Sequence, residues 1–234
     1  GPATDAPGIL EKLFDIGVDV VRLNYSHSTN EDHERRLEAV RKLSLERRHA
    51  VGIIADLQGP KIRIQKFGTG KVQLHEGDTF TFDTGLSQSG GNQERVGVSY
   101  KKLPKDVKAG DTIVLDDGRI EVMVNEVNEH EVKCNVITGG ELSDRKGMNL
   151  RGGGLSAASL TQKDKQDLKH AVKIGADFIA VSFVRSAEDI HLARSLIEKQ
   201  GGTAGIIAKI ERSEALDNIE SIIEASEIIM IARG

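Results

Sequence analysis

The chain has 234 residues, of which 38% are hydrophobic, and a formal net charge of −4 at pH 7. This size and composition are typical of a globular protein that buries a sizeable core, and the mild negative charge argues against a nucleic-acid partner. No run approaches the ~18 apolar residues of a membrane span, and the start at Gly1 lacks the regions of a signal peptide. The single cysteine, Cys134, suits a reducing compartment. We therefore expect a cytoplasmic protein with neither a membrane nor a nucleic-acid partner.

Two parts of the chain, residues 8–64 and residues from about 160 to 234, combine helical periodicity with short apolar runs. This combination predicts βα units around a parallel sheet that is buried on both faces. The predicted strands are Asp19–Leu23, Val51–Ala55, Asp177–Ser182, Gly205–Ile210 and Glu227–Ala232. Apolar residues at helical spacing are expected to face the sheet, in the sets Leu37/Val40/Leu43, Leu168/Ala171/Val172, Ile190/Ala193/Ile197 and Leu216/Ile219/Ile222/Ile223.

Local signals refine this α/β prediction. Thr161 followed by Asp164 predicts the start of a helix, because the hydroxyl caps the helix and the carboxylate complements its dipole. The segments Gly17–Leu23 and Gly175–Val181 share one pattern, in which a helix-stopping glycine precedes an aspartate and an apolar strand. Such repeated βα units favour a (β/α) barrel, the TIM-barrel fold, and a doubly wound sheet is the alternative.

The middle of the chain contains alternating strands separated by turn residues. The predicted strands are Lys71–Leu74, Thr79–Phe82, Arg95–Val98, Thr112–Leu115, Arg119–Val124 and Glu131–Ile137. Asp117-Gly118 predicts a hairpin with a two-residue turn, because glycine tolerates the positive φ of such turns. Residues 65–158 are thus expected to form an inserted all-β domain, and residues 1–64 with 159–234 the α/β domain. Gly152–Gly154 is interpreted as a hinge or as a plain linker.

Polar residues follow the apolar strands of the α/β domain, namely Arg22, Asn24 and Ser26, then Asp56, then Lys209 and Glu211. Arg22, Asn24 and Ser26 occupy alternate positions, so they share one face if the strand continues through Ser26. Lys209 and Glu211 likewise point the same way on an apolar strand, where charges are costly unless a ligand uses them. Barrel enzymes place catalytic groups at the carboxyl ends of their strands, and the alternative is that each residue is a solvated loop charge.

The residue types indicate which chemistry such a site would perform. Arg22 and Arg63 carry guanidinium groups suited to bidentate recognition of phosphate, and Glu211 offers the oxygen ligand that Mg²⁺ prefers. Lys209, beside a metal-bound carboxylate, can stabilise negative charge on a carbonyl or enolate oxygen. The pattern predicts a metal-assisted barrel enzyme that acts on a phosphorylated or carboxylated small molecule.

Seven segments, in order along the chain, resemble the pyruvate kinase family in its bacterial form: Val20–His27, Asp56–Arg63, Leu115–Gly118, Lys146–Leu150, Ala180–Arg185, Ile207–Glu211 and Met230–Gly234. The resemblance implies a (β/α)8 TIM barrel, truncated here at both ends, with the β domain inserted as a mobile lid. It implies phosphoryl transfer from phosphoenolpyruvate to ADP, giving pyruvate and ATP in glycolysis. It also implies Mg²⁺ or Mn²⁺ as cofactor and a homotetramer for the full-length enzyme.

The resemblance implies a role for each candidate residue. Arg22 would contact the phosphoryl group, Arg63 would bridge phosphoenolpyruvate and the nucleotide phosphates, Lys209 would stabilise the transferring group and the enolate, and Glu211 would bind the divalent metal. Asn24, Ser26 and Asp56 match the family's monovalent-cation ligands, His27, Arg145 and Lys146 fall near the nucleotide, and Ser182 and Arg185 line the barrel.

One departure from the family pattern concerns K⁺. Leu57 stands where K⁺-dependent members carry a threonine ligand, and Lys61 stands in place of a glutamate. An ammonium at Lys61 can supply the positive charge that K⁺ otherwise provides, and a site that held both cations would be electrostatically crowded. We therefore predict that the full-length enzyme is active without K⁺.

Two other function classes remain open. A metal-dependent barrel aldolase or lyase also needs a carboxylate and a basic residue, and a desolvated Lys209 can form a Schiff base. A catalytically inactive fragment is the second alternative, because about five strands cannot close an eight-stranded barrel. The family's second acidic Mg²⁺ ligand would also follow Gly234. The resemblance thus implies an enzyme, but not that these 234 residues act alone.

Overall fold

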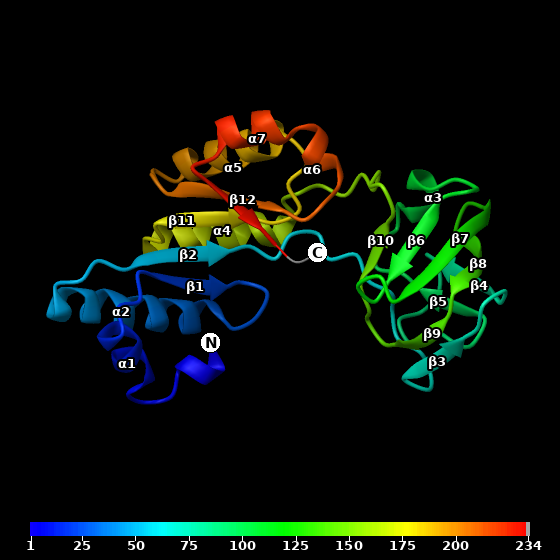
Figure 1. Ribbon diagram of the computed structural model, residues 1–234, viewed down its shortest axis with the longest axis horizontal. Helices are drawn as coiled ribbons and strands as arrows, with labels where there is room; N and C mark the ends of the chain where they lie inside the picture. Colours follow the sequence, from blue (N-terminus) through cyan, green and yellow to red (C-terminus); the bar gives the residue numbers. More distant parts are fainter. Residues whose placement is uncertain (233–234) are drawn as a thin grey trace. The chain divides into compact units, whose positions relative to one another are not determined.

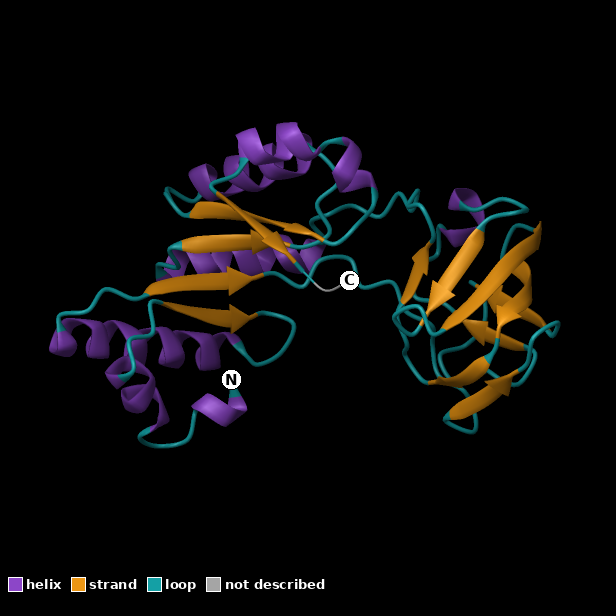
Figure 2. Ribbon diagram, viewed as in Figure 1, coloured by secondary structure: helices purple, strands orange, loops and turns teal. Residues whose placement is uncertain are grey.

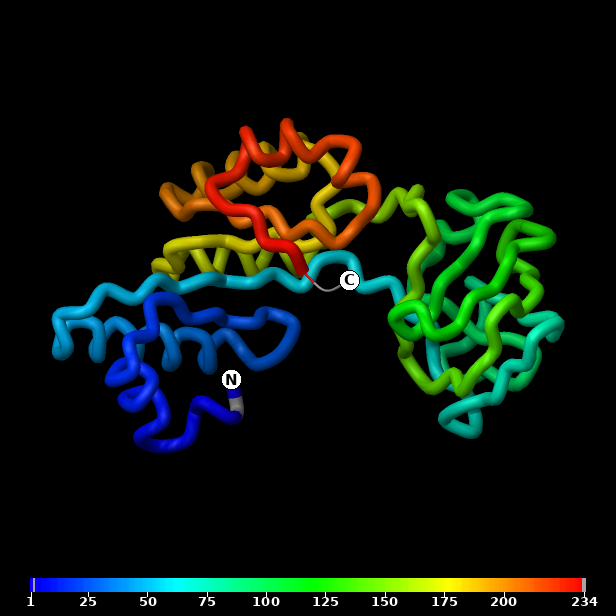
Figure 3. The backbone as a smooth tube through the Cα atoms, viewed as in Figure 1, coloured from blue at the N-terminus to red at the C-terminus, as the bar shows by residue number. Residues whose placement is uncertain are grey.

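The computed structural model describes residues 1–232, without the side chain of Pro2. They form two compact units, one made of residues 1–60 and 158–232 and the other of residues 61–157. Figure 3 shows that the blue-to-cyan and yellow-to-red parts of the chain build the first unit and the green part builds the second. Each unit has its own hydrophobic core. The two units are therefore described one at a time.

The first unit contains a five-stranded parallel sheet (Figure 2). Its strands are β1 (Val20–Asn24), β2 (Gly52–Asp56), β11 (Phe178–Val181), β12 (Gly205–Ile210) and β13 (Ile228–Ile231). They lie in the order β1-β2-β11-β12-β13, so their order in space follows their order in the chain. A doubly wound sheet reverses its strand order at a switch point, whereas a barrel does not. The sheet confirms the predicted incomplete (β/α) barrel and its five predicted strands.

Helices connect these strands and form one continuous layer (Figure 1). The unit contains the 3₁₀ turn η1 (Pro2–Thr4) and the helices α1 (Ile9–Asp15), α2 (Asn30–Arg47), α4 (Gln162–Ile174), α5 (Ala187–Lys199), α6 (Glu214–Asp217) and α7 (Ile219–Ala225). Contacts run from α1 to α2, α4, α5 and α7 in chain order. The core between helices and sheet includes the strand residues Leu23, Ile53, Ala55, Ile179, Val181, Ile206 and Ala208. Within residues 1–232, no helix is long and apolar enough to cross a membrane.

Two predictions about the helices have different outcomes. Thr161 caps α4 as predicted: its hydroxyl accepts the N–H of Asp164, whose side chain accepts the N–H of Thr161. The expectation that Leu216 and Ile223 both face the sheet is wrong, because they are 63% and 52% exposed. The backbone leaves helical geometry at Asn218, between α6 and α7, and this break changes the direction in which the apolar residues point.

The second unit is built almost entirely of strands and contains one short helix, α3 (Leu103–Asp106), among the described residues. Its strands are β3 (Lys71–Leu74), β4 (Thr79–Asp83), β5 (Arg95–Gly97), β6 (Thr112–Leu115), β7 (Ile120–Val127), β8 (Glu131–Thr138), β9 (Gly140–Ser143) and β10 (Met148–Leu150). Six strands form one sheet in the order β10-β6-β7-β8-β4-β5, and β3 pairs with β9. The six strands predicted for this region are confirmed, whereas β9 and β10 were not predicted.

Asp117-Gly118 lies in the hairpin between β6 and β7, as predicted, but the turn is longer than two residues. Leu115 pairs with Ile120, so four residues, 116–119, connect the strands. Asp116, Asp117 and Gly118 have φ angles of 49°, 56° and 91°. Three consecutive residues with positive φ thus belong to a four-residue connection that replaces the predicted two-residue turn, and Asp116 is buried in it.

Candidate functional site

Four of the polar residues predicted for the site, Arg22, Asn24, Asp56 and Lys209, lie on the face of the sheet opposite the helix layer. Asn24 is in register with Asp56, and Asp56 is in register with Ala180. Residues in register in a parallel sheet point to the same face, as do residues two apart along a strand. The face that carries Asp56 therefore also carries Arg22 and, through the register of β11 with β12, Lys209.

Four charged side chains meet at the carboxyl ends of these strands. Nε and Nη2 of Arg22 each lie 2.5 Å from Oδ2 of Asp56. Nζ of Lys209 lies 3.2 Å from Oδ1 of Asp56 and 3.3 Å from Oε1 of Glu211. The structure thus brings four of the predicted site residues into one network, in which two cations alternate with two carboxylates and the formal charges cancel.

The network is open to solvent at one end. The side chains of Asp56, Lys209 and Glu211 are 2%, 11% and 10% exposed, whereas that of Arg22 is 53% exposed. Oδ1 of Asp56 is buried without a hydrogen bond, so its contact with the Lys209 ammonium is ionic. Removing one partner from buried ion pairs leaves an uncompensated charge. Arg22 is the member of the network that a dissolved anion can reach first.

Ser182 directs the ammonium of Lys209. Nζ of Lys209 donates to Oγ of Ser182 at 2.8 Å, and that hydroxyl donates to the carbonyl oxygen of Leu57 at 2.7 Å. The ammonium donates a hydrogen bond to Ser182 and contacts the carboxylates of Asp56 and Glu211 as ion pairs. Lys209 is therefore held in one position, and Ser182 joins the predicted residues that the structure brings together.

Glu211 is oriented by a backbone group. Its Oε2 accepts the N–H of Phe183 at 3.0 Å, and Phe183 has a φ of 56°, which is unusual for a bulky residue. The carboxylate keeps lone pairs for a further partner, so it fits Mg²⁺, which binds one or two carboxylates together with ligand oxygens. Within the described part of the chain there is no group of three or more His, Cys, Asp or Glu side chains that could enclose a metal.

The loop after β1 carries the other predicted cation ligands. β1 ends at Asn24, so Ser26 does not continue the face of the strand. Instead, Oδ1 of Asn24 accepts the N–H of Ser26 at 3.0 Å, and the carbonyl oxygen of Asn24 accepts the N–H of His27 at 3.2 Å. His27 is exposed. These contacts form a tight turn that lies beside Asp56 because Asn24 and Asp56 are in register.

Arg63, Arg145, Lys146 and Lys61 belong to the second unit. Nη1 of Arg63 donates to the carbonyl oxygen of Arg145 at 3.2 Å, and Nζ of Lys146 lies 2.7 Å from Oδ1 of Asp116. Asp116 was not predicted as a site residue, although it lies in one of the seven resembling segments. Within this unit, the segments that carry Arg63 and Lys146 lie side by side, because Arg63 forms an antiparallel β-bridge with Gly147.

Tyr25, which was not predicted as a site residue, fastens the loop after β1 to the helices. Its hydroxyl lies 2.9 Å from Nδ1 of His170, its carbonyl oxygen accepts Nζ of Lys163 at 2.9 Å, and its ring stacks on His33 with centroids 4.2 Å apart. Burial raises the pKa of Tyr25 above its ordinary value. Burial, together with nearby Arg36 and His170, lowers the pKa of His33. Tyr25 and His33 are therefore neutral at pH 7 and act as packing groups.

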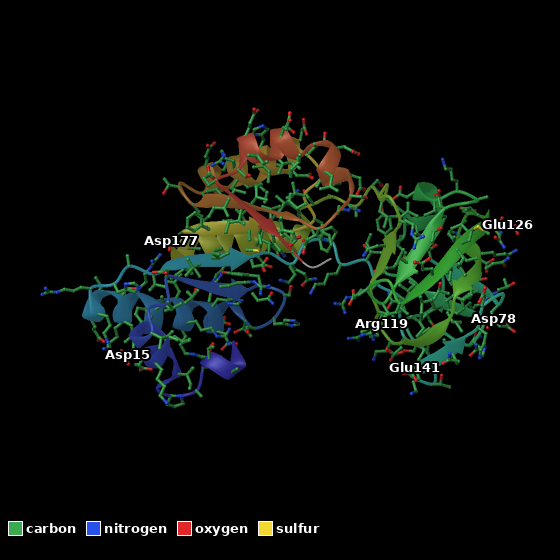
Figure 4. All side chains as sticks on the ribbon, in the orientation of Figure 1. Asp15, Asp78, Arg119, Glu126, Glu141 and Asp177 are labelled. Atoms are coloured by element: carbon green, nitrogen blue, oxygen red, sulfur yellow. The ribbon has the colours of Figure 1, made fainter. Side chains whose placement is uncertain are left out.

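Charged residues elsewhere in the unit support the fold. At the amino ends of the strands, Asp177 (labelled in Figure 4) accepts the N–H of Ile53 at 2.7 Å and Nη2 of Arg41 at 2.8 Å, tying α2 to the sheet. Residues at the amino ends of barrel strands usually stabilise the fold. Arg185, which was expected to line the barrel, binds Asp189 at the start of α5. Burial raises the pKa of Asp189, but hydrogen bonds from Arg185 and Ser159, together with the charge of Arg185, hold that pKa below its ordinary value.

Comparison with known proteins places this chain in a family. The family model described as pyruvate kinase, barrel domain, matches residues 1–234. The chain belongs to the pyruvate kinase family. It is 48% identical over 237 residues to a pyruvate kinase of Buchnera aphidicola subsp. Acyrthosiphon pisum, and also 48% identical to pyruvate kinase II of Salmonella typhimurium.

The match to pyruvate kinases extends to structure. The fold superposes on that of a pyruvate kinase from Cryptosporidium parvum with a TM-score of 0.91 and 35% identity, covering 99% of this chain and 49% of that one. The chain spans about half the length of the curated pyruvate kinases it matches, 49% in the two bacterial examples. The resemblance drawn from seven segments is confirmed, and family membership favours pyruvate kinase over the aldolase or lyase alternative.

Proposed function

We propose that this chain takes part in phosphoryl transfer from phosphoenolpyruvate to ADP, which gives pyruvate and ATP. The observation that carries the proposal is the buried ammonium of Lys209, which Ser182 holds between the carboxylates of Asp56 and Glu211. Phosphoryl transfer from an enol phosphate gathers negative charge on the transferring group and on the enolate oxygen. A fixed cation in a site that excludes water stabilises such charge strongly.

Arg22 is the proposed first contact for the phosphoryl group. It directs Nε and Nη2 to a single oxygen of Asp56, so Nη1 and the second N–H of Nη2 remain for an anion. Binding to Arg22 would place the phosphoryl group beside the strand ends that carry Lys209. In the second unit, we assign Arg63 and Lys146 to the phosphates of phosphoenolpyruvate and the nucleotide, with His27 of the first unit on the nucleotide side.

Glu211 is the proposed metal ligand. A bound Mg²⁺ or Mn²⁺ would supply positive charge to the oxygens of the substrate. The network around Lys209 has no formal net charge, so a divalent cation would give the site the surplus that a phosphate ester requires. The N–H of Phe183 occupies Oε2 and leaves the carboxylate in a fixed orientation.

We further propose that the first unit is part of a barrel domain and the second unit is a lid. The unit boundaries, at residues 60/61 and 157/158, lie within four residues of the boundaries predicted from the sequence, at 64/65 and 158/159. Gly152, Gly153 and Gly154 have φ angles of 78°, 85° and 103°. Glycine adopts such positive φ angles at little energetic cost, whereas other residues do not. Three of them in succession therefore support a hinge rather than a plain linker. Family membership supports a cytoplasmic location and a homotetramer as parts of the same proposal.

Pyruvate formation from phosphoenolpyruvate and ADP, measured with Mg²⁺ on the purified 234-residue chain, tests this function. Calorimetric titration with phosphoenolpyruvate provides a second measurement that does not need turnover. We expect saturable binding that Arg22→Ala weakens and Arg35→Ala leaves unchanged, because Arg35 is an exposed residue of α2 that pairs with Asp32. The absence of both turnover and saturable binding would contradict the proposal.

Omission of K⁺, with an organic cation keeping the ionic strength constant, is expected to leave turnover unchanged. Asp56 already has Arg22 and Lys209 as counter-ions, and Leu57 packs its side chain into the core where it cannot bind a cation. The proposal assigns to Lys61 the positive charge that K⁺ supplies in other members of the family. We expect Lys61→Gln to introduce a response to K⁺ and Lys66→Gln, the control, to introduce none. Loss of turnover on omitting K⁺ from the unaltered chain would overturn the prediction.

A further inference from the structure

Two helices of the first unit begin with the same motif in different surroundings. Thr29 with Asp32 starts α2, and Thr161 with Asp164 starts α4, each pair forming a capping box. The box of α2 is exposed, and Oδ1 of Asp32 pairs with Arg35 of the same helix at 2.8 Å. The box of α4 is not exposed, because Asp164 is fully buried. A capping carboxylate works at the surface, so its burial, which is costly, requires another explanation.

The second oxygen of Asp164 supplies that explanation. Oδ2 accepts the N–H of Thr161 at 2.8 Å, which completes the cap, while Oδ1 accepts the N–H of Gly59 at 2.9 Å. Gly59 lies 105 residues earlier in the chain, in the loop that follows β2. The carboxylate therefore joins the start of α4 to the loop at the carboxyl end of β2.

Gly59 is pressed against the loop that follows β11. Its φ is 68°, and a Cβ atom at this position would lie 2.7 Å from Cβ of Ser182 and 2.8 Å from Cδ2 of Phe183. Contacts this short exclude any side chain, and the positive φ disfavours one as well. The two loops interlock at Gly59, and the hydrogen bond from its N–H to Asp164 holds the interlock in place.

The two loops that meet at Gly59 also hold the two charged side chains at the end of β12, Lys209 and Glu211. The carbonyl oxygen of Leu57, two residues before Gly59, accepts the hydroxyl of Ser182 that directs the Lys209 ammonium. The N–H of Phe183, on which Gly59 packs, directs the carboxylate of Glu211. A displacement of Gly59 would thus move the partners of Lys209 and Glu211 together.

We propose that Asp164 is a positioning residue for the pair Lys209 and Glu211. It fixes Gly59, and through the two interlocked loops it sets where the ammonium and the carboxylate point. Asp164 touches neither group itself. Its importance for turnover rests on the proposed function, but its effect on the position of Lys209 can be measured without turnover.

The reactivity of the Lys209 amine toward acetic anhydride, followed by peptide mass spectrometry on the 234-residue chain, tests the proposal. Asp164→Asn cannot accept both N–H groups, because one carboxylate oxygen becomes an NH₂ donor. We expect Lys209 to be acetylated about 3- to 10-fold faster in Asp164→Asn, the change that follows from losing one hydrogen bond. Asp32→Asn, which damages the same motif in α2, is the matched control and should leave the Lys209 rate unchanged.

A double variant separates positioning from general loosening. If Asp164 acts on Lys209 through Ser182, then Asp164→Asn combined with Ser182→Ala should react no faster than Ser182→Ala alone. Additive rates, or a normal rate in Asp164→Asn, would overturn the proposal. Asp164→Glu provides the test if the asparagine variant does not fold, because threonine with glutamate also forms a capping box while the added methylene displaces the oxygen that binds Gly59.

Kinetics extend the test to catalysis. Asp164→Asn should lower kcat and leave KM for phosphoenolpyruvate unchanged, whereas a purely structural role would lower the amount of active protein without changing either constant. An unaltered chain without turnover or substrate binding would count against the proposed function, and the acetylation rates would still decide the role of Asp164.

Discussion

Replacing Lys209 by methionine is expected to lower kcat by about 10³-fold while leaving the KM for phosphoenolpyruvate nearly unchanged. Arg22 is the exposed member of the network, whereas the Lys209 ammonium lies inside, between Asp56 and Glu211. In the proposed function, Arg22 would meet the substrate first, and the ammonium would act mainly on charge that develops as the phosphoryl group leaves the enolate oxygen. Steady-state measurement of ATP formation gives both constants.

Stability has to be measured on the same Lys209 variants. Lys209→Met leaves the carboxylates of Asp56 and Glu211 without the ammonium, and breaking a buried ion pair costs about 3–5 kcal/mol. Lys209→Arg keeps the positive charge but changes its shape, so we expect it to retain more stability and still lose turnover. Lys42→Met, on the exposed side of α2, is the control and should change neither property. A folded Lys209→Met variant with ordinary kcat would contradict the assigned role.

Phe80→Ala is expected to destabilise the second unit by about 3–5 kcal/mol and to leave the first unit unchanged. Phe80 is fully buried and packs edge-on against Phe82, with ring centroids 5.6 Å apart. Both residues belong to the core of the second unit, which is separate from the core between helices and parallel sheet. Amide hydrogen exchange followed by mass spectrometry resolves the two units, so it shows which amides lose protection.

Ile53→Ala is the matched control for Phe80→Ala, because Ile53 is fully buried in the core of the first unit. It should reverse the pattern, with faster exchange in residues 1–60 and 158–232 and ordinary protection in residues 61–157. Equal loss of protection in both units after either substitution would show that the chain unfolds as one cooperative block.

The fold was predictable where one local pattern determines an element. β12 begins and ends at the predicted residues, Gly205 and Ile210, because the apolar run Gly205–Ala208 is typical of a strand buried on both faces. β9 and β10 have no such pattern: Gly140–Ser143 contains a single large apolar residue, and β10 has three residues. These two strands form because β3 and β6 offer pairing partners from distant parts of the chain, which no local pattern records.

The charged residues of the site were predictable from the sequence, but the hydrogen bonds that position them were not. Asp56, Lys209 and Glu211 were recognisable as charges at the ends of apolar strands, and the register of the sheet brings them together. The hydrogen bonds of Ser182 to Leu57 and of Asp164 to Gly59 were not predictable, because their partners are backbone atoms and any residue carries those. The roles of Arg63 and Lys146 stay predictions, as do those of Asn24, Ser26 and His27.

The alternation along β12 has a consequence for folding as well as for chemistry. Ile206 and Ala208 face the helices, and Lys209 faces the opposite side. A shift of the strand by one residue would turn every side chain over and force the ammonium into the apolar layer, where an unpaired charge costs several kcal/mol. The charge of Lys209 therefore also penalises misaligned pairing of β12. Lys209 helps the sheet to select its correct register before any substrate is present.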